Sequence, residues 1–98
     1  MDRATALSRL RTLESELRRR GVGSLFLFGS AARNEAAAGS DLDLFLDPST
    51  EARLSLLDII GIGHFIEERL ATPVDVMTRA SLHPLLRSDI EAEAVPVF

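Results

Sequence analysis

The sequence predicts an α/β (α+β) fold in which a small mixed three-stranded sheet is flanked by about four helices. Three short apolar segments have the pattern of strands, and the segments around them have the apolar spacing or the start signals of helices. The 98 residues contain no internal repeat or linker, and 46% of them are hydrophobic. This length and composition suit a single domain, 1–98, with one core.

The expected elements alternate in the order αβαβαβα. They are helix 2–20, strand 24–28, helix 31–35, strand 42–46, helix 51–70, strand 73–77 and helix 85–93. Leucine recurs at helical spacing in the first helix, and Gly21 follows three arginines as a stop signal. The first strand is apolar and bounded by glycines, and the short second helix begins just after Gly29 and Ser30.

The second half of the chain follows the same alternation. Leucine occupies every second position of strand 42–46, and the third strand again places an acid between branched apolar residues. A broad apolar face predicts the long helix, in which Gly61 and Gly63 predict a kink or close packing. Pro84 suits the start of the last helix. The apolar tail, 95–98, is expected to pack either on the body of the protein or on a partner.

Charge and composition exclude several classes of function. The net charge is −4, which argues against direct nucleic-acid binding, and all eleven basic residues are arginine. The absence of cysteine excludes disulfides and thiolate metal sites. No apolar run is long enough to cross a membrane, and the first residues lack the apolar region of a signal peptide. We therefore expect a cytoplasmic protein with no membrane contact.

Two acids lie at the start of the second apolar strand, one just before it and one inside it, and a third lies in the third strand. Asp41 and Asp43 are two residues apart, so their side chains point to the same face. At about 4 Å and an effective dielectric constant near 20, two such charges repel by about 4 kcal/mol. Mg²⁺ is the simplest ion to offset this repulsion, and Asp75 completes the cluster if its strand lies beside the second. The alternative is a turn residue followed by a solvent-facing strand residue.

Gly29 and Ser30 stand between a strand and a predicted helix start. Glycine lets a ligand approach the backbone closely, and the free N–H groups of a helix N-terminus attract phosphate. A tight turn with Ser30 as the N-cap is the alternative. A phosphate-binding turn that faces metal-binding carboxylates is the arrangement required for phosphoryl or nucleotidyl transfer.

These residues resemble a known signature. The segment FGSAARNEAAAGSDLDLFLD is similar to that of the polymerase-beta-like nucleotidyltransferase superfamily, in which Gly-Ser is followed about ten residues later by D-x-D in an apolar strand. The ending TPVDVMTRASLHPLLRSDIEAEAVPVF resembles one branch, the minimal nucleotidyltransferases of bacteria and archaea. The resemblance covers nearly the whole chain.

The resemblance implies a role for each matching residue. Gly29 and Ser30 would hold the β- and γ-phosphates of a nucleoside triphosphate, and Asp41 and Asp43 would bind Mg²⁺. Asp75 would complete the second metal site and help to deprotonate the attacking hydroxyl.

Other positions near the motif are also expected to contribute to the nucleotide site or its turns. Arg33 would contact the triphosphate, with a surface role as the alternative, and Ser40 would be a turn or cap residue of the nucleotide site. Asn34 replaces the glycine common in this branch, and asparagine tolerates the left-handed backbone of such a turn. Asp47 is expected to be a turn or cap residue.

Both histidines, His64 and His83, are expected to be structural or solvent-facing.

The resemblance implies an enzyme that uses Mg²⁺ and ATP to transfer AMP to a hydroxyl. The acceptor would be a tyrosine of a cognate HEPN-domain toxin, held in a hetero-oligomer, and the protein would be the antitoxin of a type VII-like toxin–antitoxin pair. One alternative is a non-catalytic antitoxin that acts by occluding its partner. Another is a transferase for a small-molecule hydroxyl, although the sequence has no room for an acceptor domain.

Overall fold

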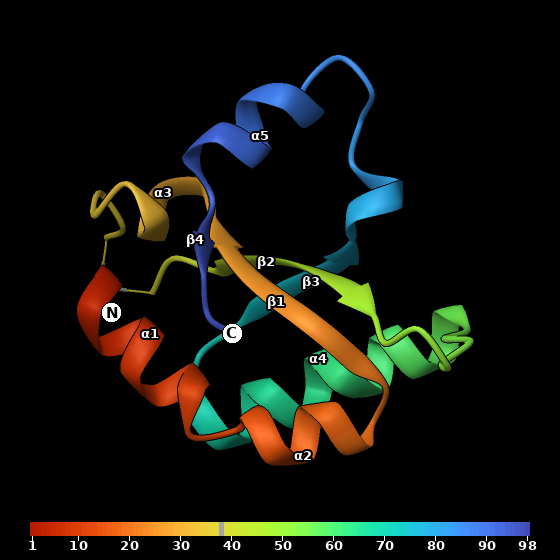
Figure 1. Cartoon of the computed structure of the whole chain (residues 1–98). Coiled ribbons are helices and arrows are strands. Elements are labelled where there is room, and N and C mark those ends of the chain that lie inside the picture. Colours follow the sequence, from red (N-terminus) through yellow and green to blue (C-terminus); the bar gives the residue numbers. More distant parts are fainter. Residues whose placement is uncertain (38) are drawn as a thin grey trace.

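The computed structural model describes residues 1–37 and 39–98, and it contains a four-stranded sheet flanked by helices (Figure 1). Residue 38, between the predicted helix 31–35 and strand 42–46, lies outside the described residues. In chain order the elements are α1 (Arg3–Arg11), α2 (Glu14–Arg19), β1 (Val22–Phe28), α3 (Gly29–Ala32), β2 (Leu42–Pro48), α4 (Leu56–Leu70), β3 (Val74–Thr78), the 3₁₀ helix η1 (Arg79–Ser81), α5 (Arg87–Glu93) and β4 (Val95–Pro96). The predicted fold class is confirmed, with one strand more than expected.

The sheet is mixed, and its strands lie in the order β3-β2-β1-β4. β1 pairs antiparallel with both β2 and β4, whereas β2 and β3 are parallel. The additional strand comes from the apolar tail, which packs on the body of the protein. The Val97 amide donates to the Leu25 carbonyl at 2.8 Å, and the side chain of Val97 is buried.

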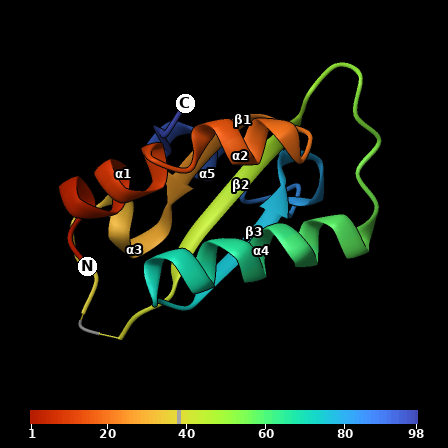
Figure 2. The same cartoon turned by 90° about the horizontal axis from the view of Figure 1, so that it is seen from below.

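One face of the sheet forms the main core. The leucines of β1 and β2 point to this face, where α1, α2 and α4 cover them (Figure 2). Leu42, Leu44 and Leu46 are almost completely buried, as the alternation along this strand predicts. Because the leucines point to this face, Asp43 between them points to the other.

The second face carries a smaller apolar cluster. Phe28, Phe45 and Leu82 are buried there, with Phe26 and Met77 packed against them. The rings of Phe26 and Phe45 stack with their centroids 4.8 Å apart. In Figure 1, α5 lies on this side of the sheet, away from α1, α2 and α4.

Several predicted boundaries were wrong. The first helix divides into α1 and α2 because the Thr12 hydroxyl donates to the Arg9 carbonyl at 2.6 Å and competes with the helical backbone. The long helix begins at Leu56, five residues later than expected, because Ser55 and Asp58 form a capping box there. The last helix begins at Arg87, two residues after the expected start.

The two glycines of α4 do not interrupt the helix. α4 is continuous from Leu56 to Leu70, so the kink that was one of the two expectations does not occur. Gly63 instead faces β3, where an added Cβ would lie 3.8 Å from the side chain of Val76. None of the helices in the described residues has both the length and the hydrophobicity needed to cross a bilayer.

Candidate active site

The parallel pairing of β2 and β3 brings two of the predicted acids together. Asp43 lies opposite Asp75 in the register of the two strands, which confirms that the third predicted strand lies beside the second. Asp75 is exposed and Asp43 is half-buried. Asp41 precedes β2 by one residue and is exposed. The fold therefore collects carboxylates at one end of the sheet.

The turn after β1 is pressed against Asp43. Gly29 has a φ of 72°, in the left-handed region that favours glycine. A Cβ at this position would lie 2.2 Å from Oδ2 of Asp43, so only glycine can occupy it without displacing the carboxylate. Ser30 follows in α3 and is half-buried. Gly29 thus brings the end of β1 and the start of a short helix to the acidic cluster.

The surroundings of Asp43 disfavour its negative charge. Burial raises the pKa of Asp43, and the nearby carboxylates of Asp75 and Asp41 raise it further. Arg33 acts in the opposite direction, and Glu93 adds to the increase. The chain itself therefore leaves an excess of negative charge at this end of β2.

The donor set suits a hard cation. Three carboxylates, with no thiolate or imidazole among them, are the ligands that Mg²⁺ prefers. Within 1–37 and 39–98, however, no group of three or more acidic, histidine or cysteine side chains is already arranged to hold a metal ion. The backbones of Asp43 and Asp75 are held by paired strands, whereas Asp41 lies outside β2 and is exposed, so a three-carboxylate site would need these side chains to rearrange around the ion.

Glu93, which the sequence analysis did not predict as a site residue, accepts hydrogen bonds from the groups predicted to bind phosphate. The Gly29 amide donates to Oε1 of Glu93 at 3.1 Å, and Nη1 of Arg33 donates to Oε2 of the same carboxylate at 2.9 Å. Arg33 also donates to Glu35 at 3.1 Å. An anion of this protein is thus bound by an amide and a guanidinium, as a phosphate would be. The sequence offered one signal, the closing Glu-Ala segment, but not its partner 64 residues earlier.

The remaining predicted residues lie around this cluster. Asn34 has a φ of 60°, which confirms the predicted left-handed turn, and its Oδ1 accepts the Arg3 amide at 3.1 Å. The Ser40 amide donates to the Ala37 carbonyl in the turn before Asp41. His64 and His83 are both exposed, which agrees with a solvent-facing role.

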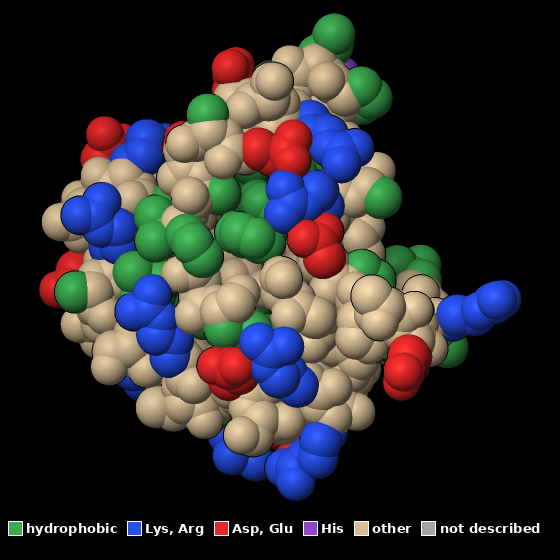
Figure 3. Space-filling model, in the orientation of Figure 1, with side chains coloured by type: hydrophobic (Ala, Val, Ile, Leu, Met, Phe, Trp, Pro, Cys, Tyr) green, Lys and Arg blue, Asp and Glu red, His purple; other side chains and the backbone are tan. Residues whose placement is uncertain are grey.

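The prediction for Asp47 was wrong. This residue is within β2 and is held by Arg79, which donates to both of its carboxylate oxygens. Arg79 also pairs with Glu91 of α5 and lies over the rings of Phe26 and Phe45. Figure 3 shows acidic and basic side chains gathered between α5 and the sheet, beside a patch of hydrophobic side chains. The sequence could not predict this pairing because 32 residues separate Asp47 from Arg79.

This geometry has a match among known protein families. The family model described as "Nucleotidyltransferase domain" matches residues 10–97, which include every predicted site residue. The chain belongs to this family. Its Gly29 turn and its paired acids are therefore parts of a nucleotidyltransferase domain, and the protein is a nucleotidyltransferase.

Two curated relatives extend this assignment. The nucleotidyltransferase is 43% identical over 82 residues to "Putative protein adenylyltransferase MJ0435" of Methanocaldococcus jannaschii, an alignment that covers 84% of this chain and 86% of the relative. It is 35% identical over 85 residues to "Protein adenylyltransferase MntA" of Thermococcus cleftensis, which covers 86% and 84% of the two chains.

Solved structures have the same fold. A structure described as a "putative minimal nucleotidyltransferase" is 34% identical, with a TM-score of 0.81, and the match covers 98% of this chain and 96% of the other. A complex of a tri-AMPylated Shewanella oneidensis HEPN toxin with an MNT antitoxin matches with a TM-score of 0.69 at 15% identity, over 98% and 71% of the chains. At that identity the second likeness shows the fold alone.

Proposed function

We propose that this protein is a Mg²⁺-dependent nucleotidyltransferase that transfers AMP from ATP to a tyrosine hydroxyl of a cognate HEPN-type toxin. It would thereby act as the antitoxin of a type VII-like toxin–antitoxin pair in the cytoplasm, with residues 1–98 working as one domain. One observation carries the proposal: Asp43 and Asp75 are paired on neighbouring strands, and Gly29 is packed against Asp43. The names of the curated relatives support a protein acceptor and an adenylyl group.

The metal would be held by Asp41, Asp43 and Asp75. Mg²⁺ bound there supplies the positive charge that offsets these carboxylates and the phosphate oxygens of ATP. The raised pKa of Asp43 agrees with this assignment, because burial and then the neighbouring carboxylates of Asp75 and Asp41 disfavour a negative charge that a bound cation would stabilise.

The nucleotide would bind through the Gly29 turn. The amide of Gly29, together with Ser30, would hold the β- and γ-phosphates, with Arg33 beside them and Ser40 in the turn at the edge of the site. Because the carboxylate of Glu93 now accepts from Gly29 and Arg33, the triphosphate must displace it. The charge of Glu93 therefore opposes nucleotide binding until the phosphates replace it.

The transfer step would use Asp75 as the proton acceptor. The oxygen of the tyrosine hydroxyl attacks the α-phosphorus of ATP, and its proton passes to the carboxylate of Asp75. A new O–P bond forms, the bond from the α-phosphorus to the bridging oxygen breaks, and pyrophosphate leaves. Asp75 is exposed on its strand, so an acceptor can approach it from solvent.

The acceptor would be supplied by a partner in a hetero-oligomer. The likeness to the antitoxin in the Shewanella oneidensis complex supports this choice of partner at the level of the fold. The residues that the structure describes form one sheet with its helices and connecting segments, and an acceptor-binding domain is not among them. A partner that brings its own hydroxyl fits this arrangement.

The decisive experiment follows labelled nucleotide onto protein. The purified chain is incubated with Mg²⁺, ATP labelled at the α-phosphate and a cognate HEPN-type toxin, beside the Asp41→Asn/Asp43→Asn variant. We expect label on the toxin with the wild type only. If no label moves and both forms still bind and silence the toxin, the protein acts by occlusion and the catalytic proposal fails. Label on a small-molecule hydroxyl instead would replace the toxin as acceptor.

A further inference from the structure

The N-terminal half of α4 and the edge of β3 enclose a groove. A cavity of about 220 Å³ lies between Ile59 and Gly63 on α4 and Val76 on β3, and a second of about 270 Å³ continues past Leu56 toward Ser81. Each is smaller than the roughly 300 to 1,000 Å³ of a typical small-molecule site. Two small connected hollows suit a row of separate side chains better than one compact ligand.

The rim of this groove is unusually apolar for exposed surface. Leu56 is 75% exposed and Ile60 is 44% exposed, and both line the groove from the first two turns of α4. Leu57, which lines neither cavity, is 78% exposed between them in the sequence. Side chains of this size gathered on one surface typically mark a protein contact. The charged groups along the groove are Glu67 and Asp75, so the groove favours a neutral or basic segment. A second copy of this chain, with its net charge of −4, is a poorer occupant.

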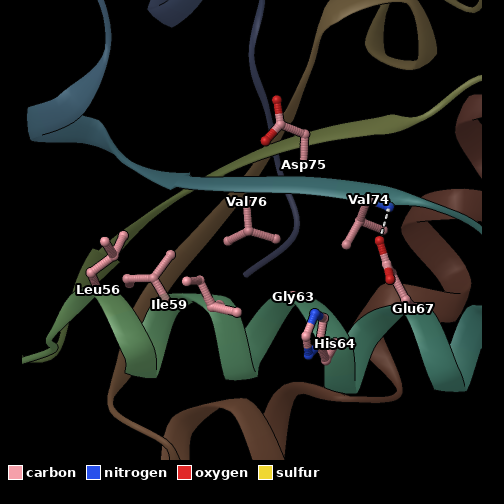
Figure 4. A pocket seen from close by; sticks show the side chains of 9 residues that line it. Leu56, Ile59, Gly63, His64, Glu67, Val74, Asp75 and Val76 are labelled. Atoms are coloured by element: carbon pink, nitrogen blue, oxygen red, sulfur yellow. Dashed lines mark hydrogen bonds between the residues drawn. The ribbon is translucent and has the colours of Figure 1, made fainter.

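β3 forms one wall of the groove and carries Asp75. It is the last strand of the sheet on this side. Figure 4 shows Asp75 on one side of β3, and Val74 and Val76 on the other, facing α4. Glu67 accepts the Val74 amide at 3.1 Å at the end of the strand farther from Leu56. An extended segment laid along β3 would place successive side chains alternately on these two sides.

We propose that the edge of β3 and the groove bind an extended segment of the acceptor protein as an additional strand. An aliphatic side chain of this segment lies in the groove against Val76 and Gly63, and the neighbouring residue carries its hydroxyl on the side of Asp75. The inference rests on the proposed function and specifies how that function selects its substrate. It makes the acceptor's local sequence, and not only its hydroxyl, part of recognition.

The two glycines of α4 provide a matched pair of variants. Gly63 lines the groove, and an added Cβ there would meet only Val76 at ordinary contact distance, so a leucine side chain can enter the groove. An added Cβ at Gly61 would meet nothing within 4 Å, and Gly61 lines neither cavity. Both substitutions replace a helix-interior glycine by a better helix former, so both variants should fold.

The test uses a library of synthetic nine-residue peptides, each with one central tyrosine between randomised residues. Labelled ATP, Mg²⁺ and wild type, Gly61→Leu or Gly63→Leu protein are added, and ATP affinity is measured separately. We expect wild type and Gly61→Leu to modify peptides that carry Val, Ile or Leu directly next to the tyrosine, with no such preference two residues away. We expect Gly63→Leu to lose at least tenfold of this labelling at unchanged ATP affinity.

Three results would overturn the inference. They are equal labelling by Gly63→Leu and Gly61→Leu, no preference at the adjacent positions, and modification of whole proteins without modification of any peptide. Failure of the proposed function has a different signature. In that case the wild type binds no ATP in the presence of Mg²⁺, or transfers AMP to no hydroxyl at all.

Discussion

The two ends of β2 present the same side chain on the same face of the sheet in opposite electrostatic surroundings. Asp43 lies opposite Asp75 and near Asp41, and its pKa is raised. Asp47, four residues later, accepts hydrogen bonds of 2.9 to 3.2 Å from Arg79. One carboxylate faces other carboxylates, and the second is paired with a guanidinium.

Under the proposed function, this difference separates the catalytic site from a structural contact. Arg79 also pairs with Glu91 and covers the rings of Phe26 and Phe45, so it joins α5 to the sheet. At the other end, Arg33 is the neighbouring cation, but Glu93 and Glu35 already hold it. The chain compensates the charge of Asp47 internally and does not compensate that of Asp43, to which the proposed function assigns a bound Mg²⁺.

The largest effect should be on catalysis. Asp43→Asn removes a proposed metal ligand, and losing about 4 kcal/mol of transition-state stabilisation lowers the rate about 1,000-fold. Asp47→Asn should leave the rate within about threefold, because Asp47 contacts Arg79 and not the site. Transfer of labelled AMP in single-turnover reactions measures both. Equal losses in the two variants would mean that the ends of β2 do not differ in function.

The next effect should be on stability. Arg79→Leu removes the bidentate contact to Asp47 and the pair with Glu91, which then keeps only its pair with Arg87 at 3.4 Å. We expect the free energy of unfolding to fall by about 2 kcal/mol. Arg19→Leu is the matched control, since Arg19 is 75% exposed and its pair with Glu16 should contribute less than about 0.5 kcal/mol. Urea unfolding that gives equal midpoints for these variants would contradict the structural role of Arg79.

A smaller effect should separate the two glutamates of α5. Glu93→Gln removes the negative charge that competes with phosphate for Gly29 and Arg33, so ATP should bind several-fold, up to about tenfold, more tightly, a gain of up to about 1.4 kcal/mol. Glu91→Gln, on the same helix but paired with Arg79, should leave ATP affinity unchanged. Isothermal titration calorimetry distinguishes them, and weaker binding by Glu93→Gln would show that Glu93 positions the donors instead of blocking them.

Local patterns were enough to predict the half of the site that depends on strand geometry. Alternation placed Asp43 opposite to the leucines of its strand, and β3 then brought Asp75 beside it. The resemblance to a known signature correctly indicated the family and the fold. Local chemistry also predicted the left-handed turn at Asn34.

Contacts between distant residues were not predictable in the same way. Glu93 lies 64 residues from Gly29, and Arg79 lies 32 residues from Asp47, so no local periodicity connects them. The fourth strand was missed because β4 has two residues and one is Pro96, which weakens any strand signal.

Magnesium should stabilise the Asp43 end of β2 selectively. At a Mg²⁺ concentration ten times its dissociation constant, binding adds about 1.4 kcal/mol to the stability of the wild type. A domain of this size should then melt about 5 to 10 °C higher. Asp47→Asn should keep this shift and Asp43→Asn should lose it, as measured by calorimetry with and without chelator. A shift that survives in Asp43→Asn would place the metal elsewhere.

The smallest effect should be a gain in stability when Asp43 is replaced and Mg²⁺ is absent. Asp43→Asn removes a half-buried charge that repels Asp75 and Asp41, so we expect the free energy of unfolding to rise by about 1 kcal/mol, a value reduced for solvent screening. Asp47→Asn should instead lower it by about 1 kcal/mol, because it weakens the contact to Arg79.

The stability that Asp43→Asn gains over the wild type should shrink as the pH falls. The pKa of Asp43 is higher in the folded chain than its unfolded value of about 3.9. As the pH falls, Asp43 is therefore protonated in the folded state before it is protonated in the unfolded state. The wild type becomes more stable relative to Asp43→Asn as the pH falls past the folded pKa of Asp43. The two proteins should be equally stable below the unfolded pKa and should differ fully above the folded one. A difference that is constant from pH 3 to 7 would mean that charge repulsion at Asp43 is not its cause.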